Sequence, residues 1–223
     1  MEDDMNRILN ARGAPLLAAL LLAACGGAPG THPDDMSATD HRAAADSHDE
    51  ESERHGEQYD PDALELRDRT AASGDVYDFV QDVYNPTSVH LAAAGEHADV
   101  AEQHRRAAEA LEAFEAEQCG SFPPDTRALC PLLGQLAGAE NTDGGVRLHF
   151  RADVNAEAVH AHVECHVAFA RTHGRDGMDH CPMYVPGVRV ERDEAGATLL
   201  LTDDEASIPL VRRRAQAHVT ATE

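Results

Sequence analysis

Metal-ligating side chains gather within residues 160–181, HAHVECHVAFARTHGRDGMDHC. His162 and His166 stand four residues apart, a spacing that places two side chains about 5–6 Å apart on one face of a helix. Cys165 follows His162 by three residues and lies within reach of the same face. Two imidazoles beside a thiolate favour a borderline or soft ion such as Zn²⁺ or copper.

His180 and Cys181 return after a glycine-containing loop and are expected to complete this ligand set. The sequence therefore predicts a metal site formed by His162, Cys165, His166, His180 and Cys181. The alternative is a disulfide between Cys165 and Cys181, because oxidised cysteines cannot bind a metal as thiolates.

Other kinds of chemistry are poorly represented. The chain has no Gly-x-Ser-x-Gly, no glycine-rich phosphate loop, no His-Glu-x-x-His and no Cys-x-x-Cys, so we do not expect an enzyme. A net charge of −23 and the absence of tryptophan also argue against nucleic acid as a partner, because phosphates require a basic surface.

The N-terminal region has the pattern of an export signal. Residues 15–24, PLLAALLLAA, form an apolar run that is too short to span a bilayer, which takes about twenty residues. It has the length of a signal-peptide core, so residues 1–24 are predicted to be a signal peptide. Translation is expected to start at Met5, because the segment that follows carries arginines and no acid.

The end of this run, Leu22-Ala23-Ala24-Cys25, resembles the lipobox of bacterial lipoproteins. The resemblance implies cleavage before Cys25, a diacylglycerol on its thiol and a further acyl chain such as palmitate on its amino group. Several acyl chains anchor a protein stably to a membrane. Because Gly26 stands where an aspartate would imply inner-membrane retention, we expect the chain in the outer membrane, facing the periplasm. The family of the mature domain is not identified.

Four cysteines follow the lipidation site. Their even number in an exported chain indicates a disulfide framework with three possible connectivities. The candidates are Cys119, Cys130, Cys165 and Cys181. We expect Cys165 and Cys181 to be joined in the oxidised protein.

Residues 25–74 are predicted to be an acidic, histidine-containing disordered tether. Between Thr31 and Asp60 there are ten acids, two arginines, four histidines and almost no large apolar residue. Such a segment buries too little apolar surface to offset its ordering entropy. His41, His48 and His55 repeat every seven residues, but in a tether they have no fixed geometry; weak ion capture is the alternative to a solvated spacer.

An α+β domain is expected from residue 75 to residue 223. Residues 75–119 are predicted to be helical, with Asn85-Pro86 at the start of a long helix that ends near Cys119-Gly120. His90, His97 and His104 on this helix are separated by two turns, about 10.5 Å, which is too far to share one ion, and are expected to form a polar stripe.

Two similar ββα units are predicted after this helix, at residues 130–173 and 181–219. Each begins with Cys-Pro and continues as a strand, a glycine turn, a strand and a helix. Their hairpins are expected to join in one four-stranded antiparallel sheet with helices on one face.

Two functions fit these features. The first is a non-catalytic envelope lipoprotein that binds Zn or Cu through the His/Cys cluster. The alternative is a disulfide-stapled structural lipoprotein that binds no metal and docks another envelope protein.

Overall fold

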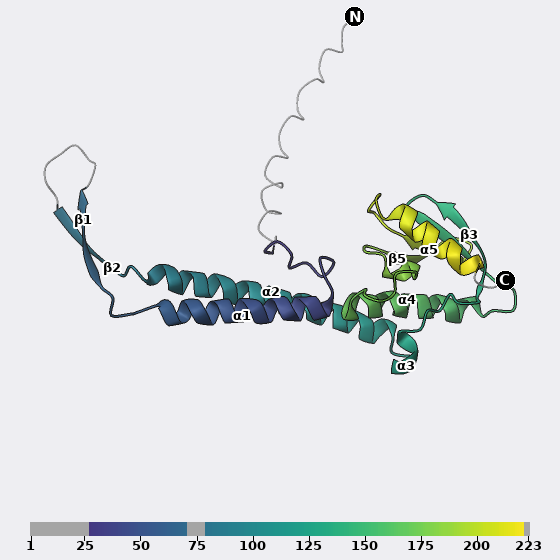
Figure 1. Cartoon of the computed structure of the whole chain (residues 1–223), viewed down its shortest axis with the longest axis horizontal. Coiled ribbons are helices and arrows are strands. Elements are labelled where there is room, and N and C mark those ends of the chain that lie inside the picture. Colours follow the sequence, from purple (N-terminus) through teal and green to yellow (C-terminus); the bar gives the residue numbers. More distant parts are fainter. Residues whose placement is uncertain (1–26, 71–78, 221–223) are drawn as a thin grey trace, which may run out of the picture.

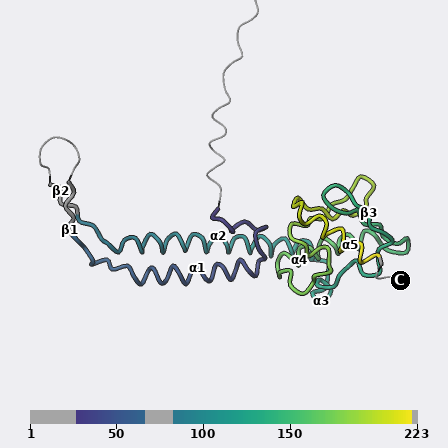
Figure 2. The backbone as a smooth tube through the Cα atoms, turned by 45° about the horizontal axis from the view of Figure 1, so that its top comes forward, coloured from purple at the N-terminus to yellow at the C-terminus, as the bar shows by residue number. Residues whose placement is uncertain are grey.

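The computed structural model describes residues 27–70 and 79–220, which form a long helical hairpin and an α+β part (Figure 1). Helices α1 (Ala38–Gln58) and α2 (Ser88–Gln118) make up the hairpin and run side by side away from the sheet (Figure 2). The predicted signal peptide and Cys25 lie outside the described residues. None of the helices in the described ranges is both long enough and apolar enough to cross a membrane.

Helix α2 confirms the predicted long helix. It begins at Ser88, with Thr87 as N-cap two residues after the predicted one; the side-chain oxygen of Asn85 accepts a hydrogen bond from the Thr87 N–H at 2.8 Å. It ends at Cys119, whose N–H donates to the Glu115 carbonyl at 2.8 Å. The end of α2 contacts α4, so this helix connects the hairpin to the α+β part.

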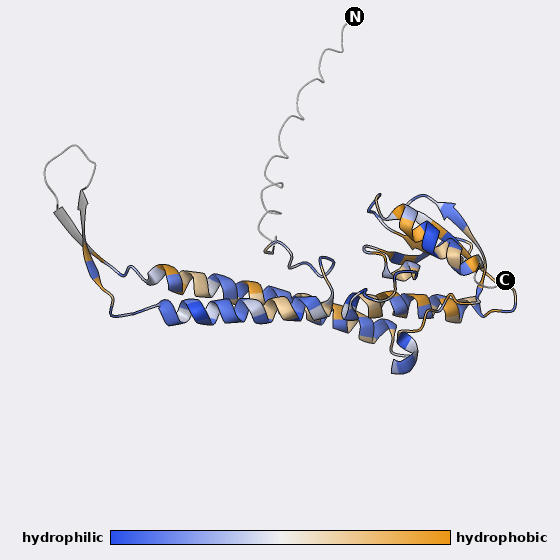
Figure 3. Cartoon of the chain, in the orientation of Figure 1, coloured by the Kyte–Doolittle hydropathy of each residue, from blue (hydrophilic) through white to orange (hydrophobic). Residues whose placement is uncertain are grey.

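Helix α1 corrects the predicted disordered tether. Ser37 caps it by accepting a backbone N–H of the first turn at 3.1 Å. Its buried residues are Ala38, His41 and Ala45, so α1 packs against α2 through small and imidazole side chains although it is largely hydrophilic (Figure 3). The tether prediction was wrong because it rested on the scarcity of large apolar residues. Regularly spaced alanines and histidines instead form a face of α1 that packs against α2.

A two-stranded hairpin lies between α1 and α2, where the sequence predicted part of the tether and a helical stretch. Strands β1 (Glu65–Thr70) and β2 (Phe79–Tyr84) are antiparallel, with Glu65 opposite Tyr84. The helical prediction for this stretch is wrong. Valine and the aromatic residues of β2 favour a strand, and pairing with β1 satisfies the backbone groups.

The predicted four-stranded antiparallel sheet is confirmed, with strand order β3-β4-β6-β5. Its members are β3 (Leu136–Thr142), β4 (Gly145–Phe150), β5 (Arg189–Arg192) and β6 (Thr198–Leu201). The two hairpins join where β4 pairs with β6. At this junction a Cβ on Gly145 would stand 1.9 Å from the Leu200 carbonyl oxygen, so only glycine fits.

The helices of the two ββα units are α4 (Ala156–His173) and α5 (Ile208–Thr220), and both pack against the sheet. Asn155 caps α4, accepting the Ala158 N–H at 3.2 Å. Two short helices, α3 (Pro124–Arg127) and η1 (Pro182–Tyr184), complete the fold. Leu148 and Leu200 from the sheet, Val163 from α4 and Val211 from α5 belong to one buried core.

Candidate metal centre

Two cysteines and two histidines from four segments meet in the α+β part. Cys130 precedes the first hairpin, and Cys181 is the N-cap of η1, ahead of the second. His166 lies on α4 and His218 on α5. We call these four residues the Cys/His cluster.

Each histidine of the cluster faces one of the cysteines. The Nε2 atom of His218 is 3.3 Å from the Cys130 sulfur, and the Nε2 atom of His166 is 3.4 Å from the Cys181 sulfur. One ligand atom from each of Cys130, His166 and Cys181 lies within 4.8 Å of the others. These side chains could hold one metal ion.

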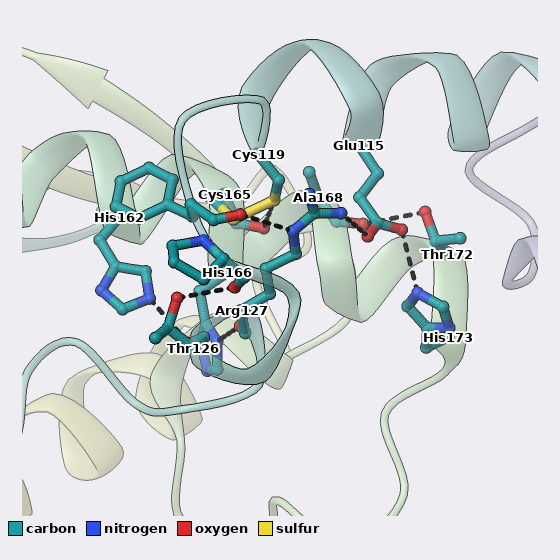
Figure 4. Close-up of a disulfide and its surroundings, with 12 residues drawn as sticks. Glu115, Cys119, Thr126, Arg127, His162, Cys165, His166, Ala168, Thr172 and His173 are labelled. Carbon is teal, nitrogen blue, oxygen red and sulfur yellow. Dashed lines mark hydrogen bonds and ion pairs between the residues drawn. A yellow bond between two sulfur atoms is a disulfide. The ribbon is translucent and has the colours of Figure 1, made fainter.

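Backbone carbonyls fix the orientation of both imidazoles. The Nδ1 atom of His166 lies 2.8 Å from the Arg127 carbonyl oxygen (Figure 4), and that of His218 lies 2.8 Å from the Arg214 carbonyl oxygen. Because a carbonyl only accepts, each Nδ1 carries the hydrogen, and the Nε2 of a neutral ring is left with its lone pair. Metal-binding histidines are held by the same kind of contact.

The two thiols share a proton unequally. A hydrogen bond from the Cys181 thiol, aided by His218, lowers the pKa of Cys130 to about 4 despite burial. The same contact, followed by burial, raises the pKa of Cys181 well above its ordinary value. Backbone N–H groups of Met183 and Tyr184 also contact the Cys181 sulfur and favour its thiolate. These opposite shifts favour the thiolate at Cys130 and the thiol at Cys181.

The two imidazoles are shifted in opposite directions. Burial lowers the pKa of His166, so its neutral form is favoured. The hydrogen bond to Cys130 raises the pKa of His218, which favours an imidazolium beside the thiolate. A metal cation bound to the Cys130 sulfur would replace the His218 proton as the positive charge beside the thiolate.

Access to the cluster is through Cys130. Cys181 and His166 are fully buried and His218 is 4% exposed, whereas Cys130 is partly exposed. Cys130 lines an open pocket of about 670 Å³ together with Phe122 and His162. An ion entering from solvent would therefore meet the Cys130 sulfur first.

The disulfide of this protein is not the predicted one. Cys165 on α4 is bonded to Cys119 at the end of α2 (Figure 4), and Cys130 and Cys181 are free. The expected Cys165–Cys181 bond is therefore wrong, and Cys165 is not a metal ligand. Adjacent helical residues point about 100° apart, so Cys165 faces α2 while His166 faces Cys181.

Two other predicted ligands lie outside the cluster. The Nε2 atom of His162 is 3.0 Å from the Thr126 carbonyl oxygen, and its ring stacks on Phe122 with centroids 4.8 Å apart. His180 is exposed. Of the five predicted ligands, the structure brings together only His166 and Cys181.

Sequence reasoning missed Cys130 and His218 as members of the cluster. The repeated Cys-Pro dipeptide was a usable signal for Cys130, because equivalent positions in two joined hairpins can come together. His218 stands alone in its helix and carried no comparable signal. Its place depends on how α5 packs against the sheet.

Comparisons with known proteins do not identify a family. No family model matches the chain, and neither a curated protein nor a solved structure is significantly similar to it. Its function is therefore argued from the side chains and their geometry.

Proposed function

We propose that this chain is a non-catalytic envelope lipoprotein that binds a soft transition-metal ion, Zn²⁺ or Cu⁺, at the Cys/His cluster. The observation that carries the proposal is the pairing of each oriented Nε2 atom with a cysteine sulfur, at 3.3 and 3.4 Å. Hydrogen-bonded thiols could explain one such contact. Cys130, His166 and Cys181 already form a three-ligand group, and His218, which contacts the Cys130 sulfur and has its Nδ1 fixed by a carbonyl as His166 does, is the fourth ligand that a small movement would add.

The donor set and spacing suit a tetrahedral ion. Two thiolates and two imidazoles form a common structural zinc site, with Zn–S near 2.3 Å and Zn–N near 2.0–2.1 Å. Those bond lengths give a sulfur–nitrogen edge of about 3.6 Å in a tetrahedron. The observed 3.3 and 3.4 Å are slightly shorter, so a small opening of these two contacts, with a movement of His218 toward the three-ligand group, would admit the ion.

Charge balance also favours a cation at this position. The metal would displace the proton from Cys181 and that from His218, leaving two thiolates and two neutral imidazoles. Two thiolates neutralise a divalent ion, and they leave a monovalent copper site with one negative charge. Since three of the four side chains are buried, a bound ion would exchange slowly with solvent.

Location in the envelope is supported by two independent features. Leu22-Ala23-Ala24-Cys25 resembles a lipobox, and a disulfide such as Cys119–Cys165 is typical of an oxidising compartment. The Ala28 N–H donates to the Gln103 side chain at 2.7 Å, so the chain already contacts α2 three residues after Cys25. Three residues span at most about 11 Å, so a lipid on Cys25 would hold α2 close to the membrane surface.

Metal analysis of the protein purified from envelopes without chelator tests the binding proposal. We expect at least one Zn or Cu per chain in the parent, and about one ion per chain fewer than the parent in Cys130→Ser, Cys181→Ser and His218→Ala. His180→Ala is the matched control, because His180 is exposed and outside the cluster. Metal content unchanged in all three cluster variants would refute the proposal.

A disulfide-stapled lipoprotein without metal is the second candidate. Cys130 and Cys181 offer ligand atoms within 4.8 Å of each other, and the chain already contains one disulfide. Oxidation of this pair would remove both thiolates. A thiol assay on unreduced, denatured protein separates the two: the metal site predicts two free thiols, and the second disulfide predicts none.

Lipidation is tested by Cys25→Ser. The expected result is loss of fatty-acid labelling and release of the protein from membranes. Outer-membrane residence is tested by density-gradient fractionation of the parent chain. If the parent takes up no label and the variant fractionates as it does, the lipoprotein proposal fails while the metal proposal stands.

A further inference from the structure

The helical hairpin has a seam of histidines that the function proposed above does not use. Three lie on α1 and three on α2, each set at seven-residue spacing, and the antiparallel helices bring the two sets together. We call the six residues the histidine ladder: His41, His48, His55, His90, His97 and His104.

The ladder consists of three cross-helix pairs whose Nδ1 atoms face each other. The Nδ1–Nδ1 distances are 2.9 Å for His41–His104, 3.0 Å for His48–His97 and 3.2 Å for His55–His90. The sequence predicted these histidines to be a polar stripe and part of a solvated spacer. The spacer prediction was wrong, because the three histidines of α1 lie on a helix and face the polar stripe of α2.

Stacked contacts join successive pairs into a continuous row. The His48 ring lies 5.7 Å from that of His104, and the His55 ring lies 5.5 Å from that of His97, each stacked. Burial decreases along the row: His41 and His104 are 0% and 4% exposed, whereas the other members are partly exposed. The row therefore runs from the buried end of the hairpin to a solvent-accessible region.

An ordinary helical seam would not be built in this way. The heptad positions where paired helices meet are normally apolar, and a buried polar group costs free energy unless it is partnered. Two neutral imidazoles that face each other through Nδ1 can share only one hydrogen. Six imidazoles in register are better explained by a ligand that uses their lone pairs.

We propose that the histidine ladder binds divalent transition-metal ions of the imidazole-preferring class, Zn²⁺, Cu²⁺ or Ni²⁺. Imidazole is a preferred ligand of these ions. Two nitrogens bound to one tetrahedral Zn²⁺ stand about 3.3 Å apart, given Zn–N bonds near 2.0–2.1 Å. The three observed Nδ1–Nδ1 distances lie just below this value, so a small opening of each pair would admit an ion.

The best-equipped position lies toward the outer end of the ladder. Glu51, His55 and His97 offer three ligand atoms within 4.8 Å of one another, and all three side chains are partly exposed. The Glu51 carboxylate also pairs with Arg54, whose exposed guanidinium can move aside. Carboxylates outnumber arginines along α1, so the local charge attracts cations.

The test separates the ladder from the Cys/His cluster. In Cys130→Ser/Cys181→Ser protein, Zn²⁺ is titrated and bound metal is measured after equilibrium dialysis. We expect at least about one Zn²⁺ per chain to remain, and that ion to be lost in the same background with His55→Leu/His97→Leu. The matched control is His149→Leu/His180→Leu, which changes two exposed histidines outside the ladder.

Leucine suits a helical seam, so the double variant is expected to keep its helix content, measured by circular dichroism. If it unfolds instead, His55→Gln/His97→Gln takes its place with the same prediction. X-ray absorption of the Zn²⁺-loaded background should show only nitrogen or oxygen neighbours. A folded ladder variant that binds as much Zn²⁺ as the background overturns the proposal, as does a background that binds none; neither result affects the cluster.

Discussion

Replacing Cys119 and Cys165 together by alanine removes the disulfide without turning either of its two cysteines into a free thiol. The bond links residues 46 positions apart, so it closes a long loop between the end of α2 and α4. In the chain-entropy model a loop of that length contributes roughly 4 kcal/mol to the free energy of unfolding. We expect a loss of that size in urea unfolding of the chelator-treated protein, followed by far-ultraviolet circular dichroism.

The same variant also distinguishes a structural cysteine from a metal ligand. Cys165 lies beside His166 in sequence but is bonded away from the cluster, so folded variant protein should keep its metal content. Treatment of the parent with a reductant should reproduce the destabilisation. A stability loss below about 1 kcal/mol would refute the loop argument. A peptide map that joins Cys165 to Cys181 would refute the assigned disulfide.

Three further outcomes are expected. Gly145→Ala should lower the free energy of unfolding by more than about 3 kcal/mol in denaturant unfolding, because its Cβ would stand 1.9 Å from the Leu200 carbonyl oxygen. Gly138→Ala is the control with a small expected effect, because its Cβ would approach only His149, at 4.0 Å. Burial lowers the pKa of His41 and His104 in the folded state, so as the pH falls these histidines are protonated in the unfolded state before they are protonated in the folded state. The melting temperature of metal-free protein should therefore fall as pH decreases below about 6.5, and His41→Leu/His104→Leu should weaken that dependence. Deletion of residues 31–60 should lower stability and helix content, since it removes α1 from its seam with α2; an unchanged melting curve would contradict that packing.

The elements with strong local signals were predictable from the sequence. The Asn85-Pro86 signal, which lies just before the observed N-cap Thr87, and the glycine turns each act within a few residues, and the corresponding helix and hairpins are present. The repeated ββα layout also predicted the joined sheet, because equivalent hairpins can pair edge to edge. Such features depend on local backbone preferences, which can be inferred from residue types and their spacing in the sequence.

The parts that depend on packing between distant segments were not predictable in this way. Cys165 and His166 are neighbours in sequence, yet one bonds to α2 and the other faces Cys181. The choice between them depends on the rotation of α4 about its axis, which helical spacing alone does not determine. His218 joins the cluster only because α5 packs across the sheet.

The histidine ladder shows the same limit at a larger scale. Its six members were visible as two heptad series, and a separation of about 10.5 Å within one series correctly excluded a shared ion along one helix. The error was to treat each series alone, since the nearest partner of each histidine lies across the seam, at 2.9–3.2 Å.

The proposed sites also differ in donor chemistry. Buried thiolates select a soft ion and exchange it slowly, whereas partly exposed imidazoles accept borderline divalent ions and exchange them faster. A mixed-metal experiment with Cu⁺ and Zn²⁺ should therefore place copper at the Cys/His cluster and zinc at the ladder. Copper on the ladder in preference to the cluster would contradict the assignment of ligand classes.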